Sequence, residues 1–209
     1  MEGKLEMQRV TMIVLAAGKS TRMGQDKLLL PFGSGTVIST VLEAVVSSGF
    51  SRVVLVTSKE TAINLKGLPK IVEVVLNHSP ELGQAHSMLL GIKRIHELGG
   101  SFGIVMGDMP LLTRRDISAI FDAFRLRSPG KTAVIPELNG RFGHPGFFEP
   151  VWLDRFMSIK GDVGGRHVIR DHMEEVVLVK GTIGCFLDID TPEDYVKALR
   201  LYREGGGVL

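Results

Sequence analysis

The chain contains short runs of almost wholly apolar residues, and segments with helical spacing separate them. The runs are Met12–Ala16, Val53–Val56, Ile71–Leu76, Phe102–Met106, Thr132–Ile135 and Val176–Val179. A strand with one face in water alternates apolar and polar residues, whereas a strand buried on both faces is apolar throughout. Buried strands that alternate with helices predict a mostly parallel sheet with helices on both sides. We therefore expect an α/β protein with a Rossmann-like fold of three layers.

Helices are expected where apolar residues recur on one helical face. These segments are 37–48, 88–99, 117–124 and 192–201, the last with Thr191 as its N-cap. A length of 209 residues fits one domain. We expect residues 1–209 to form it, with frayed tails at 1–9 and 204–209. Segment 139–166 interrupts the alternation and is rich in glycine, so we interpret it as an insertion that covers a site.

The composition excludes some kinds of partner. The formal net charge is +2, and Lys and Arg are scattered, whereas a nucleic-acid-binding protein would carry a basic face. Cys185 is the only cysteine, so no internal disulfide can form, and we expect a buried thiol in a reducing compartment. We find neither a secretory signal pattern nor the roughly 20 apolar residues that span a bilayer. We expect a soluble, cytoplasmic protein with no nucleic-acid or membrane partner.

The loop after the first apolar run has features of a phosphate-binding loop. Ligands of open α/β sheets bind at the carboxyl ends of the strands. The loop contains two glycines and three cations, which are Gly18, Gly24, Lys19, Arg22 and Lys27. Backbone N–H groups beside glycine can point at phosphate oxygens, and the cations can offset phosphate charge. A surface loop with solvated charges is the alternative.

Two common phosphate-binding motifs do not match this loop or the segment after it. A Walker A loop that ended in Gly18-Lys19-Ser20 would need glycine at position 13, where the chain has Ile13. A dinucleotide-binding fingerprint that began at Gly33 would need glycine at position 38, where the chain has Ile38. The sequence therefore disfavours P-loop kinases and dehydrogenases.

Carboxylates follow the fourth apolar run and precede the last helix. Asp108 comes soon after the run 102–106, and a carboxylate at a strand end suits a hard cation such as Mg²⁺. Asp188 and Asp190 would point the same way from a strand. Asp194 is expected to be a first-turn charge of the last helix. A turn residue is the alternative for Asp108, and a helix-start residue is the alternative for Asp190.

The loop and the acidic segments together resemble the MobA-like NTP transferases. The matching runs are Leu15-Ala-Ala-Gly18, Arg22-Met-Gly24, Lys27-Leu-Leu-Leu-Pro31, Gly107-Asp-Met-Pro110 and Asp188-Ile-Asp-Thr-Pro-Glu-Asp194. The resemblance implies a fold like that of the nucleotide-diphospho-sugar transferases. It also implies a nucleotidyltransferase that depends on Mg²⁺, for which Mn²⁺ is the alternative metal.

The same resemblance implies roles for individual residues. The nucleotide would be bound by Leu15, Ala16, Ala17, Gly18, Arg22, Lys27, Gly83 and Ser87. The catalytic residues would be Arg22, Lys27 and Asp108, because the two cations would stabilise charge during phosphoryl transfer. Asp108 and Asp190 would hold the metal. Gln84 departs from the methionine that relatives carry, and Ser87 has an ordinary helix-start position as its alternative.

Two further runs resemble a narrower branch of that family. Gly140-Arg-Phe-Gly-His-Pro-Gly-Phe-Phe148 and Gly161-Asp-Val-Gly-Gly-Arg166 are similar to runs of molybdenum cofactor cytidylyltransferases and molybdenum hydroxylase accessory proteins. The resemblance implies that His144, Asp162 and Arg166 face a pterin acceptor, so that segment 139–166 lies on the acceptor side. A structural imidazole and a plain salt bridge are the alternatives for His144 and Arg166.

The predicted reaction joins CTP to the phosphate of a molybdopterin-type acceptor and releases pyrophosphate. CTP is expected over GTP because Ala17 stands where guanylyltransferase relatives carry glycine, and its methyl group would crowd a purine. A guanylyltransferase, or a transferase for another small phosphate, is one alternative. A non-catalytic carrier that delivers the molybdenum cofactor to an apo molybdenum hydroxylase is the other.

Overall fold

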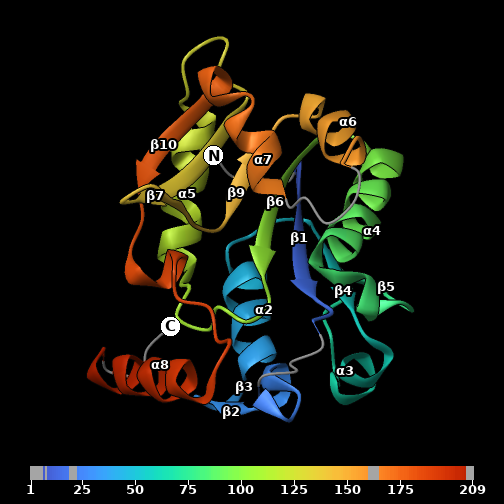
Figure 1. The fold of residues 1–209 in the computed structure, drawn as a ribbon, viewed down its shortest axis with the longest axis vertical. Coiled ribbons are helices and arrows are strands. Elements are labelled where there is room, and N and C mark those ends of the chain that lie inside the picture. The colour runs from blue at the N-terminus through green and yellow to red at the C-terminus, as the bar shows by residue number, and fades with distance from the viewer. Residues whose placement is uncertain (1–6, 8, 19–22, 160–164, 206–209) are drawn as a thin grey trace.

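The computed structural model describes residues 7, 9–18, 23–159 and 165–205 of the chain. Its main sheet has eight strands in the order β10-β7-β9-β6-β1-β4-β5, with β8 paired to β7 (Figure 1). These strands are β1 (Val10–Ala16), β4 (Arg52–Thr57), β5 (Val72–Leu76), β6 (Ser101–Met106), β7 (Ala133–Leu138), β8 (Arg141–Phe142), β9 (Gly146–Phe148) and β10 (Val176–Lys180). A separate hairpin consists of β2 (Pro31–Phe32) and β3 (Gly35–Thr36).

Seven α-helices and four short 3₁₀ helices are described. The α-helices are α2 (Val37–Ser47), α3 (Lys59–Asn64), α4 (Gly83–Leu98), α5 (Arg114–Arg125), α6 (Val151–Met157), α7 (Gly165–Arg170) and α8 (Pro192–Glu204). The 3₁₀ helices are η2 (Lys27–Leu29), η3 (Pro80–Leu82), η4 (Met173–Glu175) and η5 (Ile183–Cys185). The expected helices and the six apolar runs expected as strands are therefore present, with α8 continuing through Glu204, the first residue of the expected C-terminal tail.

The sheet is mostly parallel, as its apolar strands predict. β5, β4, β1 and β6 run parallel to one another, and β7 runs parallel to β10. β9 lies between the two groups and runs antiparallel to both β6 and β7. Segment 139–166, which we interpret as an insertion, thus contributes to the sheet itself. Its residues Gly146–Phe148 form a strand inside the sheet, and its helix α6 covers one face of that sheet.

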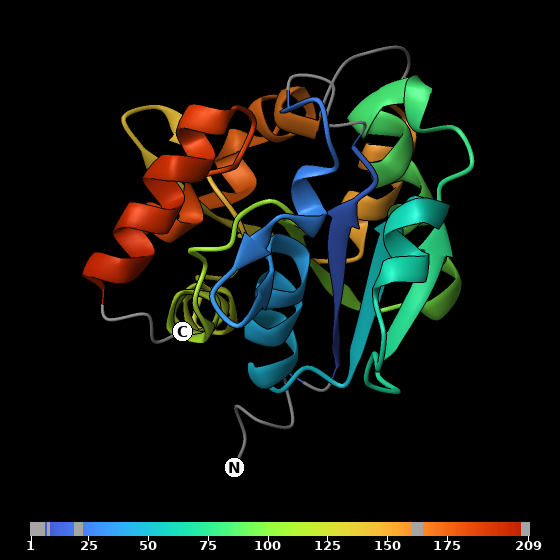
Figure 2. The ribbon, with the colours of Figure 1, turned by 90° about the horizontal axis from the view of Figure 1, so that it is seen from below.

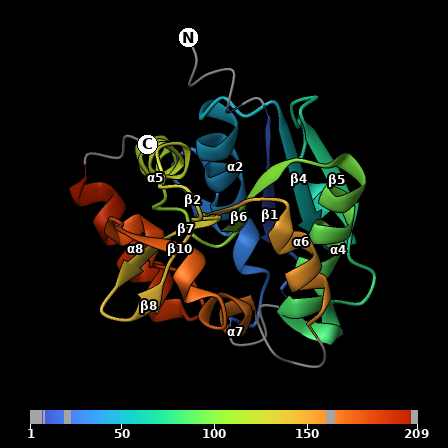
Figure 3. The ribbon, with the colours of Figure 1, turned by 90° about the horizontal axis from the view of Figure 1, so that it is seen from above.

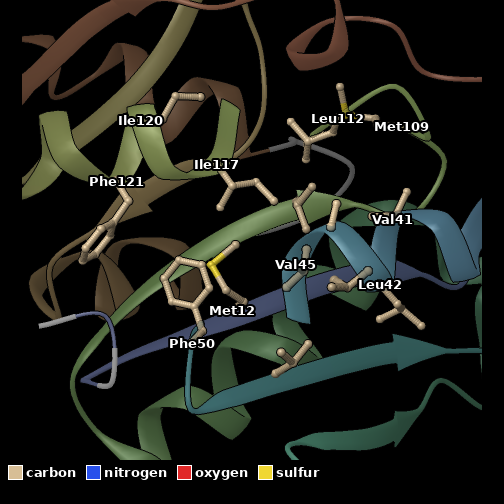
Figure 4. Close-up of a cluster of buried hydrophobic side chains, with 14 of the residues drawn as sticks. Met12, Val41, Leu42, Val45, Phe50, Met109, Leu112, Ile117, Ile120 and Phe121 are labelled. Carbon is tan, nitrogen blue, oxygen red and sulfur yellow. The ribbon is translucent and has the colours of Figure 1, made fainter. Parts of the chain in front are cut away.

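Both faces of the sheet are buried because successive residues of a strand point to opposite faces. Met12 and Val14 pack with residues of α2 and α5 on one face. Ile13 and Leu15 pack with residues of α4 and α6 on the other. Figure 3 shows α2 and α5 on one side of the strands and α4, α6 and α7 on the opposite side. Figure 4 shows how Met12, Phe50 and Phe121 lie together in the first of these layers.

Helix α8 packs beside the β2–β3 hairpin rather than on the main sheet. Its buried Ala198 lies in an apolar cluster with Phe32, Leu187 and Ile189. Pro192 opens the helix, and Thr191 and Asp194 form a reciprocal capping box at its start. Asp194 is thus a helix-start residue, as predicted. This packing brings the chain around Ile189 back to the edge of the sheet.

Across the part of the chain that is described, we find no helix with the length and apolar character needed to cross a bilayer.

Candidate active site

A cavity of about 480 Å³ opens at the edge of the sheet where the parallel strands β1 and β6 end; Figure 2 looks toward this edge. A second cavity of about 740 Å³ adjoins it and shares wall residues such as Leu15, Arg141 and His144. The first cavity is lined by all the described residues that we predicted for the nucleotide, the metal and the acceptor, namely Leu15, Ala16, Ala17, Gly18, Lys27, Gly83, Ser87, Asp108, His144, Arg166 and Asp190. Arg22 and Asp162 lie outside the described residues.

The chain enters the cavity at the end of β1. Ala16 is the last residue of the strand, and its carbonyl oxygen accepts a hydrogen bond of 2.9 Å from Thr57 Oγ1. The Ala17 side chain is buried in the cavity wall, whereas Gly18 is exposed. A Cβ added to Gly18 would meet no described atom within 4 Å, so the backbone here is open to a ligand. The geometry agrees with a loop whose backbone approaches a bound molecule.

Lys27 lies between two carboxylates. Its Nζ donates to Asp108 Oδ2 at 2.6 Å and to Asp190 Oδ1 at 2.7 Å. The side chains of Lys27 and Asp108 are each 10% exposed, and that of Asp190 is 48% exposed. Burial alone would lower the pKa of Lys27, but the carboxylates of Asp108 and Asp190 outweigh it and raise the pKa above its ordinary value. The ammonium is therefore held in its charged form.

Asp108 and Asp190 form the part of the site that fits a divalent cation. Both carboxylates already converge on one positive charge. Asp108 Oδ1 is buried and, within the described part of the chain, accepts no hydrogen bond. Burial raises the pKa of Asp108, and the Lys27 ammonium opposes that effect. The described residues hold no cluster of three or more His, Cys, Asp or Glu suited to a metal. The pair of carboxylates from Asp108 and Asp190 fits Mg²⁺, which takes one or two carboxylates and completes its shell with water and phosphate oxygens.

The start of α4 forms another wall of the first cavity. Gly83 begins the helix with φ of 82°, a left-handed conformation that side chains other than glycine adopt with strain. Ser87 is buried one turn later, and Asn77 Nδ2 donates to its Oγ at 3.0 Å. Because Asn77 supplies that hydrogen bond, the hydroxyl proton of Ser87 is left to donate to another group. Asn77 was missed from the sequence, although it directly follows the third apolar run.

His144 lies where the two cavities meet. Burial is the main cause that lowers the pKa of His144, so the imidazole is neutral at neutral pH. Its Nδ1 lies 3.2 Å from the carbonyl oxygen of Ile104. A carbonyl only accepts, so Nδ1 carries the proton, and Nε2 is left as a hydrogen-bond acceptor. The backbone N–H of His144 donates to the carbonyl oxygen of Cys185. A Cβ at the preceding residue, Gly143, would collide with that oxygen, so this close approach requires glycine.

Basic residues surround the mouth of both cavities. Arg166 at the start of α7 is exposed and lines both. Arg141 also lines both and donates to Asp188 at 2.7 Å. Residues 187–190 are not a strand, contrary to the prediction, yet Asp188 and Asp190 both face the cavity. Arg141 was not predicted, although it belongs to the glycine-rich run that pointed to His144.

The second cavity combines an apolar floor with a polar rim. Its apolar residues come from the sheet and from α4 and α6, and include Ile104, Phe148 and Phe156. Arg166 and Arg170 of α7 lie on its rim. An apolar lining with a few polar groups is typical of a cavity that binds a small organic molecule.

The chain is similar in sequence to known proteins along most of its length. The family described as MobA-like NTP transferase domain matches residues 12–176. The purine catabolism protein PucB of Bacillus subtilis is 31% identical over 194 residues, which cover 88% of this chain and 92% of PucB. The molybdenum cofactor cytidylyltransferase of Escherichia coli is 29% identical over 202 residues, which cover 95% of this chain and 100% of that protein.

Solved structures share the fold along nearly the whole chain. The crystal structure of Rv0371c from Mycobacterium tuberculosis superposes with a TM-score of 0.78 at 26% identity, over 92% of this chain and 98% of that one. A nucleotidyl transferase from Methanothermobacter superposes with a TM-score of 0.78 at 24% identity, over 94% of this chain and 99% of that one. The Rossmann-like fold of the nucleotidyltransferases is therefore confirmed.

Proposed function

The chain belongs to the family of MobA-like NTP transferases, and from this premise we propose that it transfers CMP from CTP to the phosphate of a molybdopterin-type acceptor. The observation that carries the proposal is the meeting of the β1 loop, Lys27 and two carboxylates in one cavity, with a second cavity beside it. The 29% identity to a molybdenum cofactor cytidylyltransferase across the whole of that protein supports this choice of reaction. PucB, at 31% identity, has a name that states a process and no reaction.

In this proposal the triphosphate lies against the backbone of Ala16, Ala17 and Gly18. An oxygen of the acceptor phosphate attacks the α-phosphorus in line, a new P–O bond forms, and the bond to the leaving pyrophosphate breaks. Lys27 stabilises the negative charge that develops on the transferring group. An ionised phosphate is already a nucleophile, so no side chain needs to remove a proton. Arg22, which the family resemblance implicates, would act beside Lys27.

Nucleotidyltransferases of this family typically use divalent metals. Asp108 and Asp190 are the residues that would hold such a cation here. When bound, Mg²⁺ or Mn²⁺ would withdraw charge from phosphate oxygens. Lys27 contacts the same two carboxylates, so its ammonium would exchange these partners for phosphate oxygens during turnover.

The base is assigned from Ala17, whose buried methyl group lies in the cavity wall. A single methyl group changes binding by about 1–3 kcal/mol, so the preference for CTP over GTP should be clear but incomplete. The acceptor is assigned to the second cavity, where His144, Arg166 and Asp162 would contact it. His144 offers Nε2 as a hydrogen-bond acceptor, so it would bind an N–H or O–H group of the acceptor rather than its phosphate.

A turnover assay tests the proposal. Purified protein is mixed with Mg²⁺, molybdopterin cofactor and each of the four nucleoside triphosphates in turn, and pyrophosphate release and the dinucleotide product are measured. We expect turnover with CTP above the others, and none when the cofactor is omitted. Preference for GTP would make the chain a guanylyltransferase. Tight binding of the cofactor with no pyrophosphate would make it a carrier for an apo molybdenum hydroxylase.

A further inference from the structure

The end of β4 and the helix α3 that follows it hold both ends of the loop that leads from β1 to Lys27. Thr57, the last residue of β4, donates from Oγ1 to the Ala16 carbonyl oxygen at 2.9 Å. Thr61, in α3, donates from Oγ1 to Asp26 Oδ2 at 2.8 Å. Both threonines are buried, at 0% and 1% exposure. Neither is among the residues that line the two cavities, so neither is placed to contact a ligand there.

The direction of the hydrogen bonds around Thr61 is determined by chemistry. An ionised carboxylate only accepts, so the Thr61 hydroxyl is the donor to Asp26. The Ser58 hydroxyl, 3.0 Å from Thr61 Oγ1, then donates to Thr61, and Ser58 Oγ accepts from the Thr61 amide. The N-cap hydroxyl of α3 thus orients the hydroxyl that holds Asp26.

Asp26 connects this arrangement to Lys27. Its other oxygen, Oδ1, accepts from the Leu28 amide at 3.0 Å and caps the 3₁₀ helix η2, whose first residue is Lys27. One carboxylate therefore ties α3 to the turn that carries the lysine. A single 3₁₀ turn has few hydrogen bonds of its own, so its position depends on such caps.

We propose that Thr61 is a positioning residue for Lys27, acting through Asp26. The proposal rests on the proposed function, in which Lys27 stabilises the transferring phosphate. Charge placed for a transition state loses its effect steeply when it is displaced, and a shift of about 1 Å can cost about 100-fold in rate. Without the Thr61 hydroxyl, the Asp26 carboxylate would lose one of the two hydrogen bonds that it accepts from described residues, and Lys27 would be held less accurately.

Three variants separate positioning from simple loss of stability. Thr61→Val removes the hydroxyl and keeps the branched shape, and Thr61→Ser keeps the hydroxyl. Thr40→Val is the matched control. Thr40, in α2, is also buried, and its Oγ1 donates to the carbonyl oxygen of Phe32. We expect kcat of Thr61→Val to fall about 10-fold or more, Thr61→Ser to recover most of it, and Thr40→Val to keep the wild-type kcat at a temperature where all are folded.

A double-mutant cycle with Lys27→Met then tests the path of the effect. If Thr61 acts through Lys27, adding Thr61→Val to Lys27→Met should change kcat little further. Asp26→Ala, which removes both the acceptor for Thr61 and the cap of η2, should lower kcat at least as much as Thr61→Val. Equal kcat for Thr61→Val and Thr40→Val, or additive losses in the cycle, would overturn the positioning role.

The same cycle is measured for the binding of Mg²⁺ and CTP by calorimetry, so that the inference can be judged apart from the proposed reaction. If the wild type binds CTP without turnover, the proposed reaction fails, and non-additive losses of affinity in the cycle would still support Thr61. If affinity losses are additive, the inference fails. If the wild type neither binds nor turns over CTP, both fail together.

Discussion

Replacing Lys27 by Met should destabilise the ligand-free protein, because two carboxylates would lose the cation between them. Methionine has a similar length and fits apolar surroundings, so the change removes the ammonium with little loss of volume. Asp108 and Asp190 each lie within 2.7 Å of Lys27 Nζ. In the variant these carboxylates would face each other, and Asp108 would be an uncompensated charge in a buried position.

The magnitude follows from the burial of each partner. Removing one member of a buried ion pair costs about 3–5 kcal/mol. The Asp190 side chain is 48% exposed, so its share is about 0–1 kcal/mol. Together these give about 3–6 kcal/mol. At about 2–4 °C per kcal/mol for a chain of this size, Tm should fall by about 6–24 °C.

The loss should depend on pH in a definite direction. Burial raises the pKa of Asp108 above its ordinary value of 3.8, and removing Lys27 would raise it further. A carboxyl whose folded pKa is raised destabilises the fold progressively as pH rises from the unfolded value through the folded one. The difference in Tm between Lys27→Met and wild type should therefore shrink as the pH is lowered toward 4.

A divalent cation should reverse the loss in the variant. A ligand that binds only the folded state stabilises by about 2.7 kcal/mol at 100 times its Kd. Thermal unfolding with increasing Mg²⁺ or Mn²⁺ and no nucleotide measures this, and Lys93→Met on the exposed side of α4 is the matched control. Lys27→Met should show the larger metal-dependent rise in Tm, and Lys27→Met/Asp108→Asn should lose it. An unchanged Tm in Lys27→Met, or no response to metal, would refute this account of the site.

Three further outcomes test other parts of the site. Asp108→Asn should lower kcat at saturating Mg²⁺ by at least about 100-fold, since a lost metal ligand costs several kcal/mol in the transition state; near-normal turnover of the folded variant would remove Asp108 from the reaction. Arg166→Ala should weaken binding of the molybdenum cofactor by about 1.5–3 kcal/mol and leave CTP affinity nearly unchanged, because a charged hydrogen bond is lost; titration calorimetry with each ligand distinguishes this from the reverse pattern. Burial lowers the pKa of His144, so just below pH 6.5 only the unfolded chain takes up a proton there, and stability falls with decreasing pH. Tm measured between pH 7 and 5 should therefore fall less in His144→Gln, and equal slopes would contradict a neutral imidazole.

Most of the fold could be predicted from the sequence because its strands are buried on both faces. Apolar runs such as Met12–Ala16 and Phe102–Met106 have few other stable arrangements in a chain of this length. Strand β9 was missed for a physical reason. Gly146–Phe148 is short, follows a Gly-His-Pro run, and gains its hydrogen bonds from β6 and β7. Such pairing depends on tertiary structure and leaves little periodic signal in the sequence.

Most of the residues that meet in the cavity could be named from the sequence, whereas their contacts could not. Asp108 and His144 could be selected because each stands beside a glycine, and Lys27 because it lies in the cation-bearing loop after the first apolar run and matches a family motif. The sequence did not indicate that Lys27 would contact both carboxylates, or that Asn77 would support Ser87. These contacts depend on side-chain distances that only the packed structure determines. The roles of all these residues remain predictions, and Arg22 and Asp162 lie outside the described part.

The meeting of Lys27, Asp108 and Asp190 has an identifiable structural cause. Lys27 is separated by 81 positions from Asp108 and by 163 from Asp190. The first separation is closed by the sheet, because β1 and β6 are parallel neighbours and the loops after them leave the same edge. The second is closed by one backbone hydrogen bond, in which the Ile189 amide donates to the Asp108 carbonyl oxygen at 3.0 Å. Ile189 is fully buried in the apolar cluster that α8 forms with the β2–β3 hairpin. The C-terminal helix therefore contributes to the site by holding one carboxylate next to another, and apolar contacts of α8 that lie away from the cavity should affect metal binding as well as stability.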